Sequence, residues 1–249
     1  MTHRWMLAAA AVLVLAGTAP ALALPTNVAA ALNDSSRPAA DQARDAARKA
    51  GETLELAGVR PDAKVADLIM GGGYFTRLLS AAIGAKGEVV AYQPAEFIQF
   101  RAAYGDEQKA VAAALANVKA INMSLGALDL PDGLDLVLTV QNYHDLHLTP
   151  FPKDTAAKVN AEVFKSLKPG GVYLIIDHSA APGAGLETAN TIHRIDPAIV
   201  RREVEAAGFK LDREADFLRL PSDPRTANVF SPAIRGKTDQ FVMRFVKPK

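Results

Sequence analysis

The chain of 249 residues has no cysteine, and this absence removes several classes of chemistry. Without cysteine there are no disulfides, no thiolate metal ligands, no cysteine nucleophile and no lipoprotein anchor. An excess of charge is missing too, because 28 basic and 27 acidic residues leave a net charge of +1. A nearly neutral chain has no net electrostatic attraction to nucleic acid or to an anionic membrane, so we expect neither as a partner. The rest is ordinary globular composition, 49% hydrophobic and 22% charged.

Residues 1–23 have the features of a signal peptide. His3 and Arg4 give a basic start, and the apolar run from Met6 to Leu15 is short for a membrane span. The segment Ala21 to Ala23 then matches the small-x-small pattern of a signal-peptidase site. We expect cleavage after this site and a periplasmic or secreted protein without stable membrane insertion. The alternative is an uncleaved amino-terminal anchor.

The region from residue 24 to 58 is expected to be an amino-terminal arm followed by a helix. Residues 24–37 carry few structural signals and are predicted to form a mobile arm. Ser36 is a candidate helix cap, with Pro38 in the first turn, where a missing N–H is harmless. The Ala-rich, polar stretch that follows predicts a surface helix to about Lys49.

Beyond residue 58, short apolar runs alternate with amphipathic segments. The expected strands are 64–70, 87–92, 118–123, 134–140, 172–177, one beginning at 209–211, and 240–246. The expected helices are 74–83, 106–115, 155–167 and 196–207. This alternation is typical of a parallel sheet covered by helices on both faces, and we see neither repeats nor an internal linker. We therefore expect a single α/β domain over residues 24–249.

A glycine-rich turn lies between the first expected strand and helix. Asp67 stands near the end of the strand, and Gly71 to Gly73 follow. Glycine permits a sharp turn and lets a ligand approach the backbone closely, and the helix start beyond it favours polar or anionic groups. Thr76 stands where a nicotinamide-binding fingerprint would have its third glycine.

This turn and three later segments resemble the motifs of the class I S-adenosylmethionine (SAM)-dependent methyltransferases. The later segments are Leu134 to Val137 leading into Gln141 to Asp145, Phe164 to Gly171 before the fifth strand, and the closing strand from Phe241 to Val246. The resemblance runs from about Val59 to Lys249. The stretch His193 to Asp196, with Gly208 and Phe209, is also similar to a group of bacterial predicted methyltransferases.

The resemblance implies a Rossmann-like three-layer sandwich with a mostly parallel seven-stranded sheet whose last strand is antiparallel. It also implies SAM as cofactor, bound by Asp67, Gly71, Gly73, Gln93, Asp129 and Asn142. In this scheme Asp67 holds the SAM amino group and Asp129 contacts the adenine ring. The alternatives are an N-capping carboxylate for Asp67 and a turn-forming aspartate for Asp129.

The chain departs from the family pattern at two positions. Ile69 replaces a glycine that the family usually carries two positions before Gly71. Gln93 stands at the end of the second strand, where the family usually places an acidic residue on the ribose hydroxyls. Glutamine can hydrogen-bond hydroxyls without a charge, and Glu96 is an alternative partner for them.

Histidines gather after the expected fourth and fifth strands, where open α/β sheets bind ligands. We assign catalytic roles to His144, Asp145 and His178, which would orient an acceptor hydroxyl or take its proton. A second reading makes His144, His147, Asp177 and His178 the ligands of a divalent metal. A third places His193 and Arg194 near an anionic substrate group. The plainer alternative is that each histidine caps a loop or hydrogen-bonds in the interior.

These residues favour a methyltransferase acting on a small-molecule acceptor, and no metal ligand is assigned in that function. One alternative is a non-catalytic exported protein that binds a ligand or metal on a methyltransferase scaffold. A metal-assisted hydrolase that uses the histidines is another. Fold alone does not separate these functions, so the distinction depends on the site.

Overall fold

The computed structural model describes residues 23–249. The expected signal peptide concerns residues 1–23 and so lies, except for Ala23, outside the described residues. No helix among residues 23–249 is long and apolar enough to cross a membrane.

One seven-stranded sheet runs through the centre of the molecule, in the order β3-β2-β1-β4-β5-β7-β6. Its strands are β1 (Lys64–Leu68), β2 (Glu88–Tyr92), β3 (Val118–Ile121), β4 (Leu134–Val140), β5 (Leu167–His178), β6 (Lys210–Ala215) and β7 (Gln240–Val246). Strands β1 to β5 pair in parallel, and β7 lies antiparallel to both β5 and β6. The prediction of a mostly parallel seven-stranded sheet with an antiparallel last strand is confirmed.

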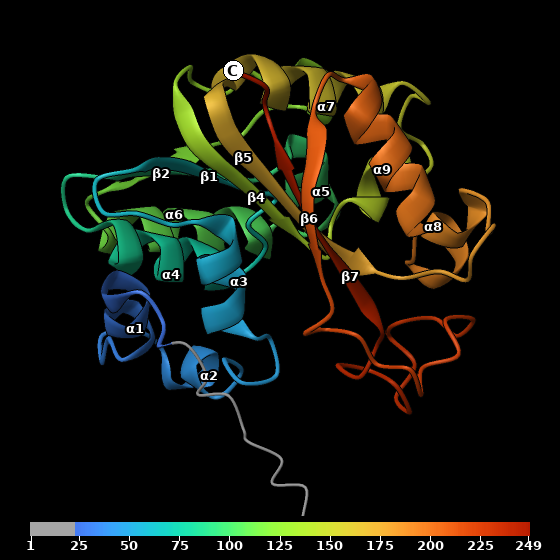
Figure 1. Ribbon diagram of the computed structural model, residues 1–249, viewed down its shortest axis with the longest axis horizontal. Helices are drawn as coiled ribbons and strands as arrows, with labels where there is room; N and C mark the ends of the chain where they lie inside the picture. The colour runs from blue at the N-terminus through green and yellow to red at the C-terminus, as the bar shows by residue number, and fades with distance from the viewer. Residues whose placement is uncertain (1–22) are drawn as a thin grey trace, which may run out of the picture.

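Helices cover both faces of this sheet (Figure 1). They are α1 (Thr26–Leu32), α2 (Ala39–Gln42), α3 (Ala50–Ala57), α4 (Tyr74–Ile83), α5 (Ala95–Phe100), α6 (Ala103–Ala114), α7 (Thr155–Ser166), α8 (Glu187–Ile192) and α9 (Pro197–Ala206), with short 3-10 turns η1 (Leu125–Ala127) and η2 (His144–His147). Helices α7 and α9 pack on one face, and α1, α3 and α4 pack on the other. The result is the expected three-layer sandwich.

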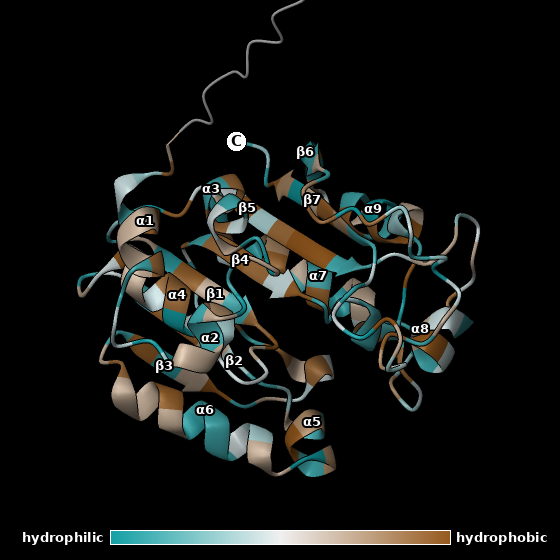
Figure 2. Cartoon of the chain, turned by 90° about the horizontal axis from the view of Figure 1, so that it is seen from below, coloured by the Kyte–Doolittle hydropathy of each residue, from teal (hydrophilic) through white to brown (hydrophobic). Residues whose placement is uncertain are grey.

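Alternating side chains of the central strands supply the two cores. Along β5, Tyr173 and Ile175 face the layer of α7 and α9, whereas Leu174 and Ile176 face the layer of α3 and α4. All four are fully buried. Strands buried on both faces read as continuous apolar runs, which is why they were recognisable in the sequence (Figure 2).

The amino-terminal region differs from its prediction. Residues 24–37 do not form a mobile arm, because they contain helix α1, whose Val28 and Ala31 are buried against the domain. The Asn27 side chain donates hydrogen bonds to the carbonyls of Val59 and Ala82, both at 3.1 Å, and so ties α1 to the fold.

The expected surface helix from Ser36 to Lys49 is also wrong. Only the four residues of α2 are helical, with Pro38 before them and no side-chain cap, and a series of turns leads to α3. Arg37 is buried and forms an ion pair with Asp45 at 2.6 Å, which folds this stretch back on itself. Local composition favoured a helix, but Asp45 and Asp41 also contact Tyr74 and Arg77 of α4, both at 2.6 Å, which hold the stretch against the domain.

Candidate functional site

The glycine turn after β1 has left-handed backbone at three residues, Ile69, Gly71 and Gly73. Ile69 has a φ of 64°, which is rare for a β-branched residue. Ile69 is buried in the core, with only 3% of its surface exposed, and its carbonyl accepts a hydrogen bond from Asn142 at 3.0 Å. Burial and this hydrogen bond hold the strained conformation. The turn therefore takes a left-handed backbone at a residue that is not glycine.

Gly71 and Gly73 both have positive φ, at 54° and 78°, but they face different surroundings. A Cβ at Gly73 would lie 2.8 Å from the Val111 side chain, so close packing of α6 requires glycine there. A Cβ at Gly71 would meet nothing within 4 Å. Of these two glycines, Gly71 is the one that borders open space where a ligand can approach the backbone.

Asp67 is buried at the end of β1, and its carboxylate accepts a hydrogen bond from the Thr76 hydroxyl at 2.6 Å. The carboxylate thus contacts a side chain in the first turn of α4, whose N-cap residue is Gly73. Burial raises the pKa of Asp67 to about 6, although the Thr76 hydrogen bond and the nearby Arg48 charge act to lower it. The group is therefore largely, but not completely, ionised at neutral pH.

Gln93 follows β2 and is completely buried. Its side-chain carbonyl accepts a hydrogen bond from the Gly71 N–H at 2.9 Å, whereas its Nε2 is buried without a hydrogen-bond partner. A buried amide donor that lacks a partner is destabilising, and such groups often mark a ligand position. Glu96, the alternative partner for ribose, instead accepts hydrogen bonds from Ser124 and Leu125 of the η1 region.

Arg48 is a residue at this site that sequence reasoning missed. Its guanidinium lies over the rings of Tyr74 and Phe75, 4.6 and 5.0 Å from their centroids, and burial lowers its pKa. It is near enough to Asp67 for its charge to act on that carboxyl. The sequence carried no signal for this role, because Arg48 falls in the stretch that was interpreted as a surface helix.

The histidine cluster is organised around Asp177, a fully buried carboxylate near the end of β5. Asp177 accepts hydrogen bonds from the backbone N–H of His144 at 2.7 Å and from its Nδ1 at 2.9 Å. The opposite nitrogen of this ring, Nε2, lies 3.3 Å from the Asp145 carboxylate. The His193 ring lies 5.5 Å away, centroid to centroid, and the His178 ring 6.1 Å away.

The charges in this cluster are strongly coupled. Burial acts to lower the pKa of His144, but Asp177 and Asp145 outweigh it and raise that pKa to about 9. Burial raises the pKa of Asp145 to about 6. Burial lowers the pKa of His178 to about 4, so this ring is neutral at physiological pH. Burial also lowers the pKa of His193. The cluster therefore holds one cationic imidazole, that of His144, and two neutral ones beside two carboxyl groups.

The four residues of the sequence-derived metal reading are not assembled as a ligand set. His147 pairs with Glu203 at 3.1 Å, and the Nδ1 of His178 lies 2.7 Å from the Thr238 hydroxyl. The Asp177 carboxylate accepts hydrogen bonds from the backbone N–H and the ring of His144. The side chains brought together are instead those of His144, Asp145 and His193, whose possible ligand atoms all lie within 4.8 Å of one another.

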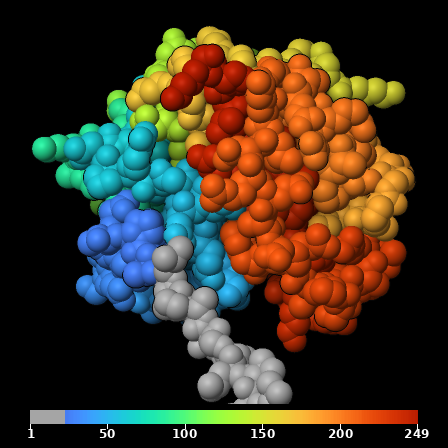
Figure 3. All heavy atoms as spheres, viewed as in Figure 1, coloured from blue at the N-terminus to red at the C-terminus, as the bar shows by residue number. Residues whose placement is uncertain are grey.

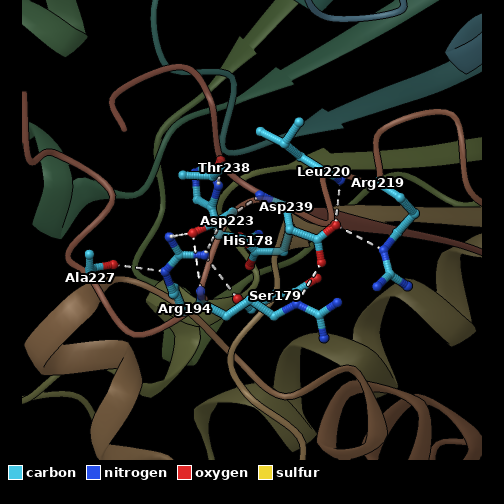
Figure 4. Close-up of polar contacts among 11 residues, drawn as sticks. His178, Ser179, Arg194, Arg219, Leu220, Asp223, Ala227, Thr238 and Asp239 are labelled. Atoms are coloured by element: carbon cyan, nitrogen blue, oxygen red, sulfur yellow. Dashed lines mark hydrogen bonds and ion pairs between the residues drawn. The ribbon is translucent and has the colours of Figure 1, made fainter. Parts of the chain in front are cut away.

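Arg194 does not face a substrate, contrary to the hypothesis that it lies near an anionic substrate group. It is completely buried and forms an ion pair with Asp223 at 2.8 Å (Figure 4). It also donates hydrogen bonds to the carbonyls of Ser179 and Ala227. These contacts anchor residues 216–239, a long segment without helix or strand between β6 and β7. Its orange and red atoms form the lower right of the molecule in Figure 3. Arg194 therefore positions its neighbour His193 and this segment.

Asp129 is not brought to the site either. It is exposed and pairs with Lys165 of α7 at 3.2 Å. With Lys64 and Glu88 it lines a surface hollow at the first residues of β1 and β2, whereas the glycine turn lies beyond the last residue of β1. Asn142 does reach the glycine turn, but its amide is occupied by the carbonyls of Ile69 and Val140.

Comparison with known proteins agrees with this architecture. No protein-family profile matches the chain. It is 32% identical over 131 residues to the ubiquinone/menaquinone biosynthesis C-methyltransferase UbiE of Shewanella piezotolerans, and 31% identical over 131 residues to that of Pasteurella multocida. The alignments cover 51% of this chain and 47% and 44% of the two relatives, so the chain matches just under half the length of these curated proteins.

Solved structures extend the likeness over most of the chain. A SAM-dependent methyltransferase from Aquifex aeolicus aligns with a TM-score of 0.57 at 21% identity, covering 82% of this chain and 93% of that one. Fibrillarin from Aeropyrum pernix, with natively bound S-adenosyl-L-methionine, aligns with a TM-score of 0.53 at 15% identity, covering 81% and 76%. The chain has the fold of the class I SAM-dependent methyltransferases, as its motifs predicted.

The buried ion pair of Arg194 leads to a stability prediction. Arg194→Leu leaves the Asp223 carboxylate buried without its cation, which should lower the free energy of unfolding by about 3–5 kcal/mol. Urea denaturation measures the change. Arg201→Leu is the matched control, because the Arg201–Glu205 pair is exposed and its loss should change stability by less than about 0.5 kcal/mol. Equal effects of the two substitutions would contradict the anchoring role.

Proposed function

We propose that this protein is a SAM-dependent methyltransferase that binds SAM at the glycine turn and a small-molecule acceptor beside the histidine cluster. The observation that carries the proposal is the meeting of Asp67, Gly71 and Gln93 at the adjacent ends of β1 and β2. This is the edge at which parallel α/β sheets bind ligands.

The residues present fit the cofactor. The unpartnered Nε2 of Gln93 is a donor for a ribose hydroxyl, and its carbonyl already fixes the amide against Gly71. The open space beside Gly71 admits the ligand to the backbone. Asp67 supplies a carboxylate for the amino group of SAM, and Arg48 supplies a cation for its carboxylate. Opposite charges at the two ends of an amino-acid moiety would set its orientation.

SAM supplies an electrophilic methyl group on a sulfonium, and the protein's contribution is to place the acceptor in line with it. The acceptor side is formed by the segments that follow β4 and β5. There His144, Asp145 and His178 would hold the acceptor's polar group and deal with its proton. Asp177 fixes the His144 ring so that Nε2 faces Asp145 and not the core.

The surroundings favour an acceptor with an apolar or aromatic body that carries one ionisable group. Phe230 is 57% exposed, and its ring lies 4.8 Å from that of His193 in an edge-on arrangement. Aromatic faces of this kind bind flat apolar molecules by offset or edge contacts. The UbiE relatives act, by their name, in ubiquinone and menaquinone biosynthesis, which is consistent with an acceptor of this class.

Substitutions in the glycine turn test SAM binding by calorimetry. We expect Asp67→Asn to weaken binding about 10- to 100-fold, because a charge-assisted hydrogen bond is lost while the side chain keeps its shape. Gly71→Val should abolish binding by filling the open space. Gly72→Ala is the matched control and should bind within about twofold of wild type, since a Cβ there meets only the Glu107 side chain, at 3.7 Å. Folded protein without SAM binding would refute the proposal.

The raised pKa of Asp67 predicts a pH dependence. Only the carboxylate attracts the amino group of SAM, and Asp67 becomes protonated as the pH falls through about 6. Affinity should therefore fall about tenfold between pH 7 and pH 5. Calorimetry on Asp67→Asn should show no such fall, whereas Asp145→Asn should retain it. A fall that persists in Asp67→Asn would assign the effect to another group.

The mature enzyme is exported and begins at Leu24. Two observations support export and this start, namely the signal-peptide features of residues 1–23 and the packing of Leu24 against the α1–α4 layer. Expressed in a Gram-negative host, the protein should appear in the periplasmic fraction with the mass of residues 24–249. Ala23→Leu should block cleavage, because a large side chain is not accepted there, whereas Leu22→Ile should be cleaved normally. Uncleaved cytoplasmic wild-type protein would contradict export.

A further inference from the structure

His144, Asp145 and His193 come from two separate segments and converge on one point. His144 and Asp145 lie in η2 after β4, whereas His193 ends α8, almost 50 residues later in the chain. Their possible ligand atoms all lie within 4.8 Å of one another. Two imidazoles and one carboxylate form a donor set that binds transition metals such as zinc, and catalytic zinc sites use three protein ligands of this kind.

The separation of the first two donors already suits a metal. A tetrahedral zinc with ligands at 2.0–2.1 Å holds them roughly 3.3 Å apart. The distance between His144 Nε2 and Asp145 Oδ1 is 3.3 Å. The ligand atom of His193 lies within 4.8 Å of both, so its ring would move by up to about 1.5 Å to complete the three.

Asp177 holds the first ligand as the outer carboxylates of metal sites do. A metal-binding histidine commonly donates its other ring N–H to a carboxylate, which fixes the orientation of the ring. The Nδ1 of His144 lies 2.9 Å from Asp177, whose side chain is completely buried. On the other side of the ring, the Asp145 carboxylate next to Nε2 is only 14% exposed. A metal bound at Nε2 takes the place of the proton that this nitrogen carries, and the proton is released to solvent.

The backbone at His193 points to a constrained role for this side chain. His193 has a φ of 54° at the end of α8, a position at which helices usually carry glycine. A side chain kept in this conformation must be held by its surroundings, and such residues cluster at functional sites. The next residue, Arg194, provides the hold through its buried ion pair with Asp223 (Figure 4).

We propose that His144, Asp145 and His193 bind one divalent transition-metal ion, best matched by Zn²⁺, and that this ion binds the ionisable group of the methyl acceptor. The second half of the proposal rests on the proposed methyltransferase function. Three protein ligands leave a coordination position open, and a hydroxyl bound there loses its proton more readily because the cation stabilises the resulting oxyanion. The acceptor then meets the methyl group of SAM as an oxyanion, and its proton goes to solvent.

Metal binding can be tested without any assay of activity. The purified full-length protein, treated with a chelator and then titrated with Zn²⁺, should bind about one equivalent. Co²⁺ in the same site should give the absorption of a four- or five-coordinate ion with nitrogen and oxygen ligands. His193→Ala and Asp145→Asn should each weaken Zn²⁺ binding at least 100-fold, and Asp177→Asn about 10- to 100-fold through the loss of the outer carboxylate.

Matched controls separate this site from adventitious binding. His147→Gln and Asp129→Asn remove a histidine and an aspartate outside the three ligands, and both variants should bind Zn²⁺ as wild type does. Circular dichroism establishes that each variant is folded. Weak or superstoichiometric Zn²⁺ binding by wild type, or binding that survives His193→Ala, would overturn the proposal.

The two proposals fail separately. SAM binding to the chelator-treated protein tests the cofactor site alone, and Zn²⁺ binding without SAM tests the metal site alone. Zn²⁺ binding without SAM binding would leave the metal site standing and remove its role in methyl transfer. SAM binding with no Zn²⁺ binding would leave a methyltransferase whose His144 and Asp145 act directly on the acceptor.

Discussion

The histidine cluster of this protein depends on one buried carboxylate, that of Asp177. It sits near the end of the central strand β5 with no exposure to solvent, and an unpaired charge there would be strongly destabilising. Its partners are the backbone and ring of His144, from the segment after the neighbouring strand β4, and the N–H of His178. These hydrogen bonds join the segments that follow β4 and β5, and they fix the orientation of the His144 ring.

A second buried ion pair holds the segments that come later in the chain. Arg194 and Asp223 are 29 residues apart in the chain and both are buried, and together they hold residues 216–239 against the end of β5. His193 stands directly beside this anchor, so its ring is carried by a rigid element although it follows a helix of only six residues. The loops that carry the histidine cluster are therefore held by charge pairs, whereas apolar packing supports the sheet and helices beneath them.

Much of the fold could be predicted from the sequence because its information is local. Strands β4 and β7 have the predicted bounds, since apolar runs that are buried on both faces differ plainly from the segments around them. The glycine turn was also predictable, because a strand, an acidic residue and spaced glycines suit one backbone course. The amino-terminal segment was not, because α1 and the turns around Arg37 depend on contacts with partners up to 55 residues away.

The sequence by itself determined the class of fold and the place of the glycine turn, because periodicity and glycine act within a few residues. Tertiary structure alone decided which charged side chains meet. Arg194 is buried in an ion pair with Asp223, and Arg48 lies over the ring of Tyr74. The His193 ring packs against His144, whereas His147 pairs with Glu203. Nothing in the spacing of these residues encodes such partners, because they are chosen by the way distant loops pack on the edge of the sheet.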